Sequence, residues 1–489
     1  MTTAILAIDQ GTTNSKAVLV STTGETLARG SSPVGIEHPQ PGWVEQSPFR
    51  IWQSVQEAIA ACLQAGPTTD ILGLAISNQR ESVTIWDAAT GEPLGPVVSW
   101  QCRRTAPDCA SLIAAGHAPR VQTLTGLPID PMFPGPKMKW LLDRVPTGRA
   151  VRLGTIDAWL IHCLTGGAVH ACDASNAARS QLYDLNRQVW SDELCDLFGV
   201  PQNALPEVRD SSARFGTTRS VPGLEDGIPI SSAIGDSHAA LFGHGAFRPG
   251  DGKVTFGTGS SVMTTLPHFI APQQGITTTI AWSIHGQPTY AFEGNILVSA
   301  AALPWMTEML GLSDVQELTD LAAAAEPGGP GFVPAFVGLG APYWQADARA
   351  LFSGITFNTT RAKMARAVTD SMAFQVHDVF KVMSAQSPAP LGRLYADGGP
   401  SKNIFLMQCV ADTLNHAIIQ CDAPEASALG AAYLAGLSLG VWPDLAAIAA
   451  LPRPGNLLRP QASDIAARLL IWRDAIYRST LPNPSTMSE

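Results

Sequence analysis

Hydrophobic residues at the start of the chain form short runs that are separated by polar turns. The runs cover residues 4–8, 17–20 and 26–28, and the turns between them contain Gly11 and Gly24. Short apolar runs bounded by Gly, Ser and Thr are typical of strands joined by tight turns. The pattern therefore predicts an antiparallel meander at the N-terminus.

A helix and a further strand are predicted after this meander. Residues 49–65 carry apolar side chains at helical spacing, and residues 71–76 form a short apolar run. That run ends in the polar group Asn-Gln-Arg-Glu at residues 78–81. Because α/β folds place their chemistry at strand ends, we expect these polar side chains to take part in function.

The middle of the chain repeats the opening pattern. Apolar residues flank the turn Gly-Thr-Gly-Ser at 257–260, about half the chain away from the first meander. A Gly- and Pro-rich stretch at residues 243–252 precedes this turn and is typical of a linker. A chain of 489 residues with 45% apolar content is long enough to bury more than one core. We therefore predict an α/β protein with two domains, residues 1–245 and 246–489.

Charge and cysteine content narrow the functional classes. The formal net charge is −10, with acidic and basic residues scattered, so the sequence shows no footprint for nucleic acid or an anionic membrane. No stretch approaches the ~20 apolar residues of a spanning helix, and the N-terminus is unlike a secretory signal. The eight cysteines include no C-x-x-C pair, and His238 and His244 are wrongly spaced for one helical face, which argues against zinc. We expect a cytoplasmic enzyme with reduced thiols, no nucleic-acid partner and no membrane insertion.

Two glycine-containing turns are candidates for binding phosphate. In the first, Asp9 ends a predicted strand and is followed by Gly11, Thr12 and Thr13, whose small side chains and hydroxyls suit phosphate oxygens beside a Mg²⁺ ion. The turn at 257–260 is a weaker candidate by itself. Either turn alone is also compatible with an ordinary hairpin. Two of them, one in each half, could hold a triphosphate from both sides of a cleft.

Motifs along nearly the whole chain resemble the FGGY carbohydrate kinase family, and within it the glycerol kinases most. They fall in family order and cover residues 9–13, 42–46, 78–81, 100–104, 132–143, 154–160, 235–236, 257–259, 334–344, 397–399 and 429–436. The resemblance implies ATP-dependent phosphorylation of a hydroxyl group of a small polyol or sugar. It also implies two domains of the ribonuclease-H-like fold that actin, hexokinase and Hsp70 share, with ATP and substrate meeting in the cleft between them.

The same resemblance assigns roles around the phosphates. Asp236 matches the catalytic base of the family, although a helix N-cap is the alternative for an aspartate ahead of an apolar helix. Asp9 matches the residue that approaches Mg²⁺, through water. The remaining matches are nucleotide contacts: Thr12, Thr13, Asn14, Gly257 and Thr258 at the phosphates, and Gly398, Gly399 and Asn403 at the adenine.

An acceptor pocket is implied by a second group of matches. The substrate-binding positions are occupied by Arg80, Glu81, Trp100, Met132, Asp236 and Ser237. A surface ion pair is the alternative for Arg80 and Glu81. Glycerol kinases usually carry Tyr, Gln, Phe and Asp where this chain has Met132, Ser237, Ser261 and Cys102. Because the change from Phe to Ser removes an apolar wall, we expect an acceptor that is longer or more hydroxylated than glycerol.

Three other functions stay open at this point. One is a ketopentose kinase of the same family, for xylulose or ribulose. Another is a non-catalytic or ATPase-switch member of the actin and Hsp70 superfold, and the third is a degenerate kinase that senses a metabolite. Arg80, Glu81, Trp100 and Asp236 favour a kinase, because a switch has no reason to carry a polyol pocket. Homodimers and homotetramers both occur in the family, and the sequence does not choose between them.

Overall fold

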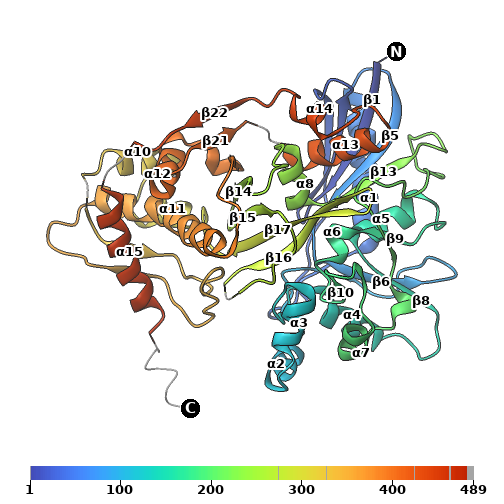
Figure 1. The fold of residues 1–489 in the computed structure, drawn as a ribbon, viewed down its shortest axis with the longest axis horizontal. Helices are drawn as coiled ribbons and strands as arrows, with labels where there is room; N and C mark the ends of the chain where they lie inside the picture. The colour runs from blue at the N-terminus through green and yellow to red at the C-terminus, as the bar shows by residue number, and fades with distance from the viewer. Residues whose placement is uncertain (1, 274, 327, 423–424, 462–463, 482–489) are drawn as a thin grey trace.

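The computed structural model describes residues 2–273, 275–326, 328–422, 425–461 and 464–481. It contains two large sheets, and the first lies in the N-terminal half of the chain (Figure 1). The strand order of this sheet is β13-β5-β1-β2-β3. The bounds of its strands are β1 (Thr2–Gln10), β2 (Asn14–Ser21), β3 (Thr26–Pro33), β5 (Thr69–Asn78) and β13 (Ile230–Gly235). β1 to β3 pair antiparallel, which confirms the meander predicted at the N-terminus.

The second sheet lies in the C-terminal half and has the order β16-β17-β15-β14-β20-β21-β22. The bounds of its strands are β14 (Gly252–Phe256), β15 (Ser260–Leu266), β16 (Thr277–Ile284), β17 (Gln287–Ile296), β20 (Leu394–Asp397), β21 (Ile418–Cys421) and β22 (Gly455–Leu458). β14 and β15 form the predicted hairpin. The strand that pairs with β15 on its other side is β17, so β16 lies outside it as an addition to the pattern of the first half.

The two sheets share one topology. In each, two antiparallel strands flank one side of the first strand, and two parallel strands follow on its other side. The series β3-β2-β1-β5-β13 thus corresponds to β17-β15-β14-β20-β21. This repeated arrangement of two α/β units is the ribonuclease-H-like fold that was predicted.

The remaining strands form small sheets that decorate the two large ones. Their bounds are β4 (Glu45–Gln46), β6 (Val83–Asp87), β7 (Val97–Val98) and β8 (Val151–Thr155) in one sheet, and the pairs β9 (Ala171–Asp173) with β12 (Glu207–Arg209), β10 (Tyr183–Asp184) with β11 (Val189–Trp190), and β18 (Gly331–Val333) with β19 (Leu351–Ser353).

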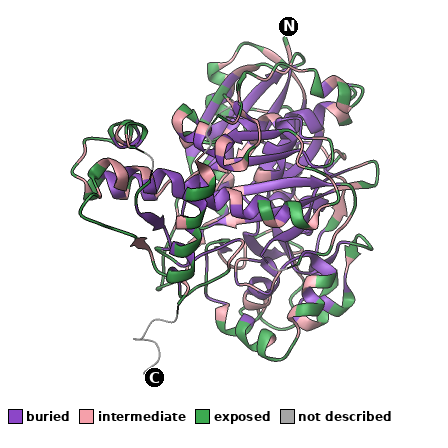
Figure 2. Cartoon of the chain, turned by 60° about the vertical axis from the view of Figure 1, so that its left-hand side comes forward, coloured by how far each residue is buried: buried purple, intermediate pink, exposed green. Residues whose placement is uncertain are grey.

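Helices cover the sheets and join the halves. Their bounds are α1 (Pro48–Ala65), α2 (Ala106–Ala114), α3 (Ala118–Thr125), α4 (Pro134–Leu142), α5 (Ile156–Leu164), α6 (Ala174–Ala177), α7 (Asp192–Phe198), η1 (Gln202–Ala204), α8 (Asp236–Gly243), α9 (Ala302–Met309), α10 (Val315–Ala323), α11 (Arg361–Gln386), η2 (Gly399–Lys402), α12 (Ile404–Leu414), α13 (Ala426–Ser438), α14 (Leu445–Ala449) and α15 (Ile465–Ser479). The sheet strands are largely buried between them (Figure 2). No helix among the described residues is long and apolar enough to cross a membrane.

Helix α13 belongs to the C-terminal half but packs against strands β1, β5 and β13 of the first sheet and against helix α8 (Figure 1). Glycines make its close approach to α8 possible. A Cβ atom on Gly430 would lie 1.8 Å from the carbonyl oxygen of Ala239, and one on Gly243 would lie 2.5 Å from that of Ala426. In addition, the Ser427 hydroxyl donates to the carbonyl oxygen of Asp236 at 3.0 Å. The second half therefore fixes the position of the helix that begins at Asp236.

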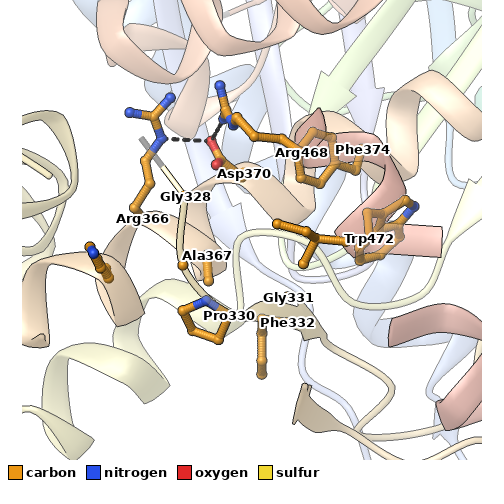
Figure 3. A pocket seen from close by; sticks show the side chains of 13 residues that line it. Gly328, Pro330, Gly331, Phe332, Arg366, Ala367, Asp370, Phe374, Arg468 and Trp472 are labelled. Carbon is orange, nitrogen blue, oxygen red and sulfur yellow. Dashed lines mark hydrogen bonds and ion pairs between the residues drawn. The ribbon is translucent and has the colours of Figure 1, made fainter. Parts of the chain in front are cut away.

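The C-terminal helix α15 is held to α11 by a cluster of charged side chains. Arg366 Nε contacts Asp370 Oδ1 at 2.9 Å, and Arg468 of α15 pairs with the same carboxylate (Figure 3). The guanidinium of Arg468 also lies over the ring of Phe374, 5.6 Å from its centroid. The cavity beside this cluster has a volume of only about 30 Å³, so it has room for about one water molecule.

Candidate active site

A cavity of about 910 Å³ lies between the two sheets and is lined by residues from both halves. The first half contributes the ends of β1 and β5 and the start of α8, and the second contributes the β14-β15 hairpin and the end of β20. The predicted site residues that line it are Asp9, Thr12, Thr13, Arg80, Glu81, Trp100, Met132, Asp236, Ser237, Gly257, Thr258, Gly398 and Gly399. The fold therefore gathers in one place residues that are distant in the sequence.

Asn14 and Asn403 are the two predicted site residues that do not line this cavity. Asn14 begins β2, and its carbonyl oxygen accepts from the Gly11 amide at 3.0 Å, which closes the first turn. Asn403 caps α12 by accepting from the Leu406 amide, and its Nδ2 donates to Thr319 Oγ1 at 2.9 Å. The contact of either residue with a nucleotide stays a prediction.

Asp9 lies at the carboxyl end of β1, where the chain turns towards Thr12. The Ser77 hydroxyl donates to its Oδ1 at 2.9 Å. Burial raises the pKa of Asp9 to about 6, although Lys16 and the Ser77 hydrogen bond lower it, and Asp236 raises it further. A buried carboxylate that lacks enough positive charge around it is suited to approach a bound cation.

Trp100 connects the predicted acceptor pocket with the turn that follows Asp9. Its indole Nε1 donates to Thr12 Oγ1 at 3.0 Å, and its backbone amide donates to Ser82 Oγ at 3.1 Å. The side chain is 36% exposed, so one part of the ring is open to the cavity. An apolar ring face with its polar edge already bonded can cover the carbon chain of a sugar.

Arg80 is held by a carboxylate from the other half of the chain. Its two Nη atoms donate to Glu293 at 2.7 and 3.0 Å, and Glu293 on β17 is fully buried. Arg179 Nη1 contacts the same carboxylate at 2.6 Å, and its Nε donates to Glu81 Oε1 at 2.6 Å. One buried glutamate of the second half thus orients Arg80 directly and Glu81 through Arg179, and both of these are predicted acceptor-binding residues.

Glu81 has an unusual backbone conformation, with φ 60, which a non-glycine residue adopts rarely. Lys137 supports it, because its Nζ donates to the carbonyl oxygen of Glu81 at 3.0 Å and to that of Met132 at 2.5 Å. Such strain persists where the surroundings hold a residue in place, and it is found more often at functional sites. The surface ion pair considered for Arg80 and Glu81 is wrong, since both residues are buried.

Asp236 is the first residue of α8, and the N-cap position belongs to Gly235. Its Oδ1 accepts from the Ser237 amide at 2.6 Å and lies 3.3 Å from Arg80 Nε. The side chain keeps 39% exposure, towards the cavity that it lines. Burial of the carboxyl group raises the pKa of Asp236, which Arg80 lowers and Glu81 raises. A carboxylate with a raised pKa is a stronger base than a free aspartate.

Three residues that the sequence did not single out belong to this site. Lys253 on β14 is 1% exposed, lines the cavity, and donates to Ser237 Oγ at 3.0 Å. Glu293 and Arg179 form the network behind Arg80. A signal was present in the sequence, because Lys253 and Glu293 are each the single charged residue of a predominantly buried strand, where a buried charge needs a partner.

Four residues of this chain differ from the glycerol kinase pattern, and three of them line the cavity. Met132, Ser237 and Ser261 line it, and the Ser237 and Ser261 hydroxyl oxygens lie 3.1 Å apart. Cys102 is fully buried, accepts a hydrogen bond from Arg104 Nε, and is not among the cavity-lining residues. The expectation that Cys102 changes the pocket is therefore corrected: three of the four departures can contact an acceptor directly.

The described part of the chain contains no group of three or more His, Cys, Asp or Glu side chains arranged to hold a metal ion. Asp9, Asp236 and Asp397 are among the carboxylates that line the cavity, and Thr12 and Thr13 add hydroxyls. Mg²⁺ is commonly held by one or two carboxylates together with water and substrate phosphates rather than by a protein cage. The donor set fits Mg²⁺ that arrives with a nucleotide, and it does not fit a resident zinc ion.

Comparisons with known proteins extend over the whole chain. Two family models match it, the FGGY family of carbohydrate kinases, N-terminal domain, over residues 4–243, and the C-terminal domain of the same family over residues 252–439. An apulose kinase of Pectobacterium atrosepticum is 45% identical over 98% of this chain and 99% of that protein. A glycerol kinase of Symbiobacterium thermophilum is 43% identical over 97% of this chain and 98% of that protein. The crystal structure of Plasmodium falciparum glycerol kinase with ADP has a TM-score of 0.93 and 30% identity, and the match covers 99% of both chains.

Proposed function

The chain belongs to the FGGY family of carbohydrate kinases, so it is an ATP-dependent sugar or polyol kinase, and we propose that its acceptor is a sugar larger than glycerol. The observation that carries this proposal is the cavity itself. The cavity has a volume of about 910 Å³ and is lined by Asp236, Arg80, Glu81 and the two glycine-containing turns. The same cavity must also hold the nucleotide, and on the acceptor side it has two small hydroxyl side chains, Ser237 and Ser261, where bulkier residues would take up space.

We assign the roles in the reaction as follows. Arg80 and Glu81 bind hydroxyl groups of the acceptor, and Trp100 covers its carbon chain. Asp236 accepts the proton of the hydroxyl whose oxygen attacks the γ-phosphorus, while the bond from that phosphorus to the β-γ bridging oxygen breaks and ADP leaves. The raised pKa of Asp236 supports this role, because such a carboxylate holds the proton more readily.

The nucleotide side is proposed from the turns at the two sheet ends. Thr12 and Thr13 face the cavity from the first half, and Gly257 and Thr258 face it from the second. Gly398 and Gly399 would lie against the adenine, where the absence of side chains admits a flat ring. Asp9 would hold Mg²⁺ through water, and the ion would offset negative charge on the phosphates.

The acceptor follows from the wall that contains Ser237 and Ser261. Two small hydroxyl side chains leave room and offer hydrogen bonds where bulkier residues would close the pocket. The relative that is named an apulose kinase makes apulose the first acceptor to test. Glycerol is the second candidate, because other relatives at about the same identity are glycerol kinases.

Two further assignments accompany the proposal. The domain boundary lies between residues 243 and 252, which is supported by the points where the two family models end and begin. A reducing compartment such as the cytoplasm is supported by the cysteines of the described chain, all of which are free.

The experiment is a coupled assay of ADP release with Mg·ATP and a panel of acceptors, which includes apulose, xylulose, ribulose, glycerol and the pentitols. Turnover with one acceptor should fall by about 10² to 10⁴ in Asp236→Asn, because the base is lost while the shape is kept. The exposed Glu308→Gln serves as the control variant with unchanged turnover. ATP hydrolysis that ignores every acceptor and the Asp236 substitution would overturn the assignment.

A further inference from the structure

One wall of the cavity consists of three hydroxyl side chains organised by a single buried amine. Lys253 Nζ donates to Ser237 Oγ at 3.0 Å and to Thr255 Oγ1 at 2.6 Å, and Ser237 Oγ lies 3.1 Å from Ser261 Oγ. All four residues line the cavity. Ser237 comes from the first half of the chain and the other three come from the second, so the wall spans the junction of the halves.

The direction of these hydrogen bonds follows from the chemistry of the amine. An ammonium group has three N–H donors and no acceptor, so Ser237 and Thr255 must each accept from Lys253. Burial lowers the pKa of Lys253, and the carboxylates of Asp397 and Asp236, which line the same cavity, oppose this shift by favouring the charged form of the amine. Whichever serine donates to the other, one O–H of the Ser237–Ser261 pair has no partner among the described residues. The wall therefore has a serine O–H, and the third N–H of Lys253, left to donate to a ligand.

The other cations on the cavity wall make no hydrogen bond to these three hydroxyl groups among the described residues. Arg80 uses its Nη atoms on Glu293 and places Nε beside Asp236. Lys402 is exposed and lies on η2, on the side of the cavity with Gly398 and Gly399. Lys253 is thus the cavity-lining cation in the described chain that combines full burial with contact to the hydroxyls next to Asp236.

We propose that Lys253, acting through Ser237 and Ser261, is a specificity-determining residue that selects acceptors with a carbonyl oxygen over the corresponding polyols. The inference rests on the proposed function, and it attributes the choice between ketose and polyol to the hydrogen-bond donors of Lys253, Ser237 and Ser261. A carbonyl oxygen only accepts hydrogen bonds, and it can take both free donors of this wall at once. A hydroxyl group in the same place must also find an acceptor for its own proton, and the ammonium group of Lys253 offers none.

The test compares each keto-sugar with the alditol obtained by reducing its carbonyl group. The measured quantity is the ratio of the two kcat/KM values, because loss of folded enzyme affects both equally and cancels. We expect a wild-type ratio above one for apulose, xylulose or ribulose. Lys253→Met should lower this ratio by about tenfold, and Ser237→Ala and Ser261→Ala by about three- to tenfold, as expected for one hydrogen bond to an uncharged group.

Two control variants match these substitutions. Thr264→Val removes a hydroxyl from the same strand as Ser261, but on the other face, where Thr264 Oγ1 contacts Met383. Lys381→Met removes an exposed lysine from α11. Both should leave the ratio unchanged. If Lys253→Met does not fold, the two serine variants carry the test, and Lys253→Arg, which keeps the charge, should retain most of the ratio.

The outcomes separate the inference from the proposed function. Equal ratios in the wild type, Lys253→Met and the serine variants would overturn the inference while the enzyme remains a kinase. A wild type that phosphorylates alditols in preference to ketoses would also overturn it. Absence of turnover with every acceptor would remove the proposed function itself. Calorimetric binding of ketose and alditol without ATP provides a second readout, and binding of the ketose should weaken in the same three variants.

Discussion

Two buried groups of side chains in this molecule have nearly the same composition and different consequences. In the first, Arg80 and Arg179 share Glu293 between the halves of the chain. In the second, Arg366 and Arg468 share Asp370 and hold α15 to α11 (Figure 3). Each joins segments that are distant in the sequence by two arginines around one carboxylate.

The surroundings separate the two clusters. The arginines of the first continue to Glu81 and Asp236, and these line a cavity of about 910 Å³. The arginines of the second end on aromatic rings, Phe405 and Phe374, beside a space of about 30 Å³. An arginine–carboxylate cluster therefore points to function here only where its arginines have further partners that face a cavity.

The largest effect is expected from Glu293→Gln, which removes the carboxylate that two buried guanidinium groups share. Removing one partner of a buried ion pair typically lowers the free energy of unfolding by about 3–5 kcal/mol. Arg80 and Glu81 would also shift, and a misplacement of about 1 Å can reduce kcat/KM by about 10²-fold. Urea unfolding and steady-state kinetics on the folded fraction measure the two effects separately. Normal kcat/KM in a destabilised protein would show that Glu293 supports the fold alone.

A smaller effect, on stability without activity, is expected from Asp370→Asn. Arg366 and Arg468 retain more contact with solvent than Arg179, so the free energy of unfolding should fall by about 2–3 kcal/mol. Because this cluster does not reach the large cavity, kcat/KM of the folded protein should match that of the wild type. Urea unfolding and steady-state kinetics test this prediction as well. A loss of kcat/KM in folded Asp370→Asn would contradict the conclusion that only the Glu293 cluster affects activity.

The parts of the site that could be predicted from the sequence are those that depend on residues close together along the chain. The turns after Asp9 and at residues 257–260 could be found because a glycine and hydroxyl residues follow a strand, and the helix at 49–65 because its apolar spacing is regular. Arg80 was found from its place at the end of a strand. The predicted helix agrees with α1 to within one residue at its start.

The ion pairs of Arg80 and Arg179 with Glu293 could not be predicted from the sequence, because the partners are distant in the sequence and meet only in the folded chain. Arg80 and Glu293 are 213 residues apart, and only the docking of β17 onto the first half brings them together. The wall of Lys253 and Ser237 has the same origin, since one residue belongs to each half. For Cys102 the opposite error occurred: the residue adjoins the pocket in sequence, but its side chain is buried behind the cavity wall.

The smallest effect on stability, and the one with a pH signature, is expected from Asp9→Asn measured without nucleotide or Mg²⁺. Burial raises the pKa of Asp9 to about 6, above its ordinary value of 3.8. Such a group stabilises the folded state fully below the ordinary value, and this contribution is lost as pH rises through about 6. At pH 8 the wild type lacks it, so the neutral variant should be more stable by about 1–3 kcal/mol.

This advantage of Asp9→Asn should shrink as pH falls from about 6 towards 4, where the wild-type carboxyl group becomes protonated as well. Thermal unfolding at a series of pH values measures it, with Asp370→Asn as a comparison that should be less stable than the wild type at pH 8. Turnover of Asp9→Asn should be lost at every pH, because an amide is a poor substitute for a carboxylate near a cation. A variant that is both less stable and active would contradict the role of Asp9. Stabilisation with loss of turnover would show that the charge of Asp9 is needed for turnover and lowers the stability of the folded protein. Asp370, in the cluster between α11 and α15, is expected only to stabilise the fold.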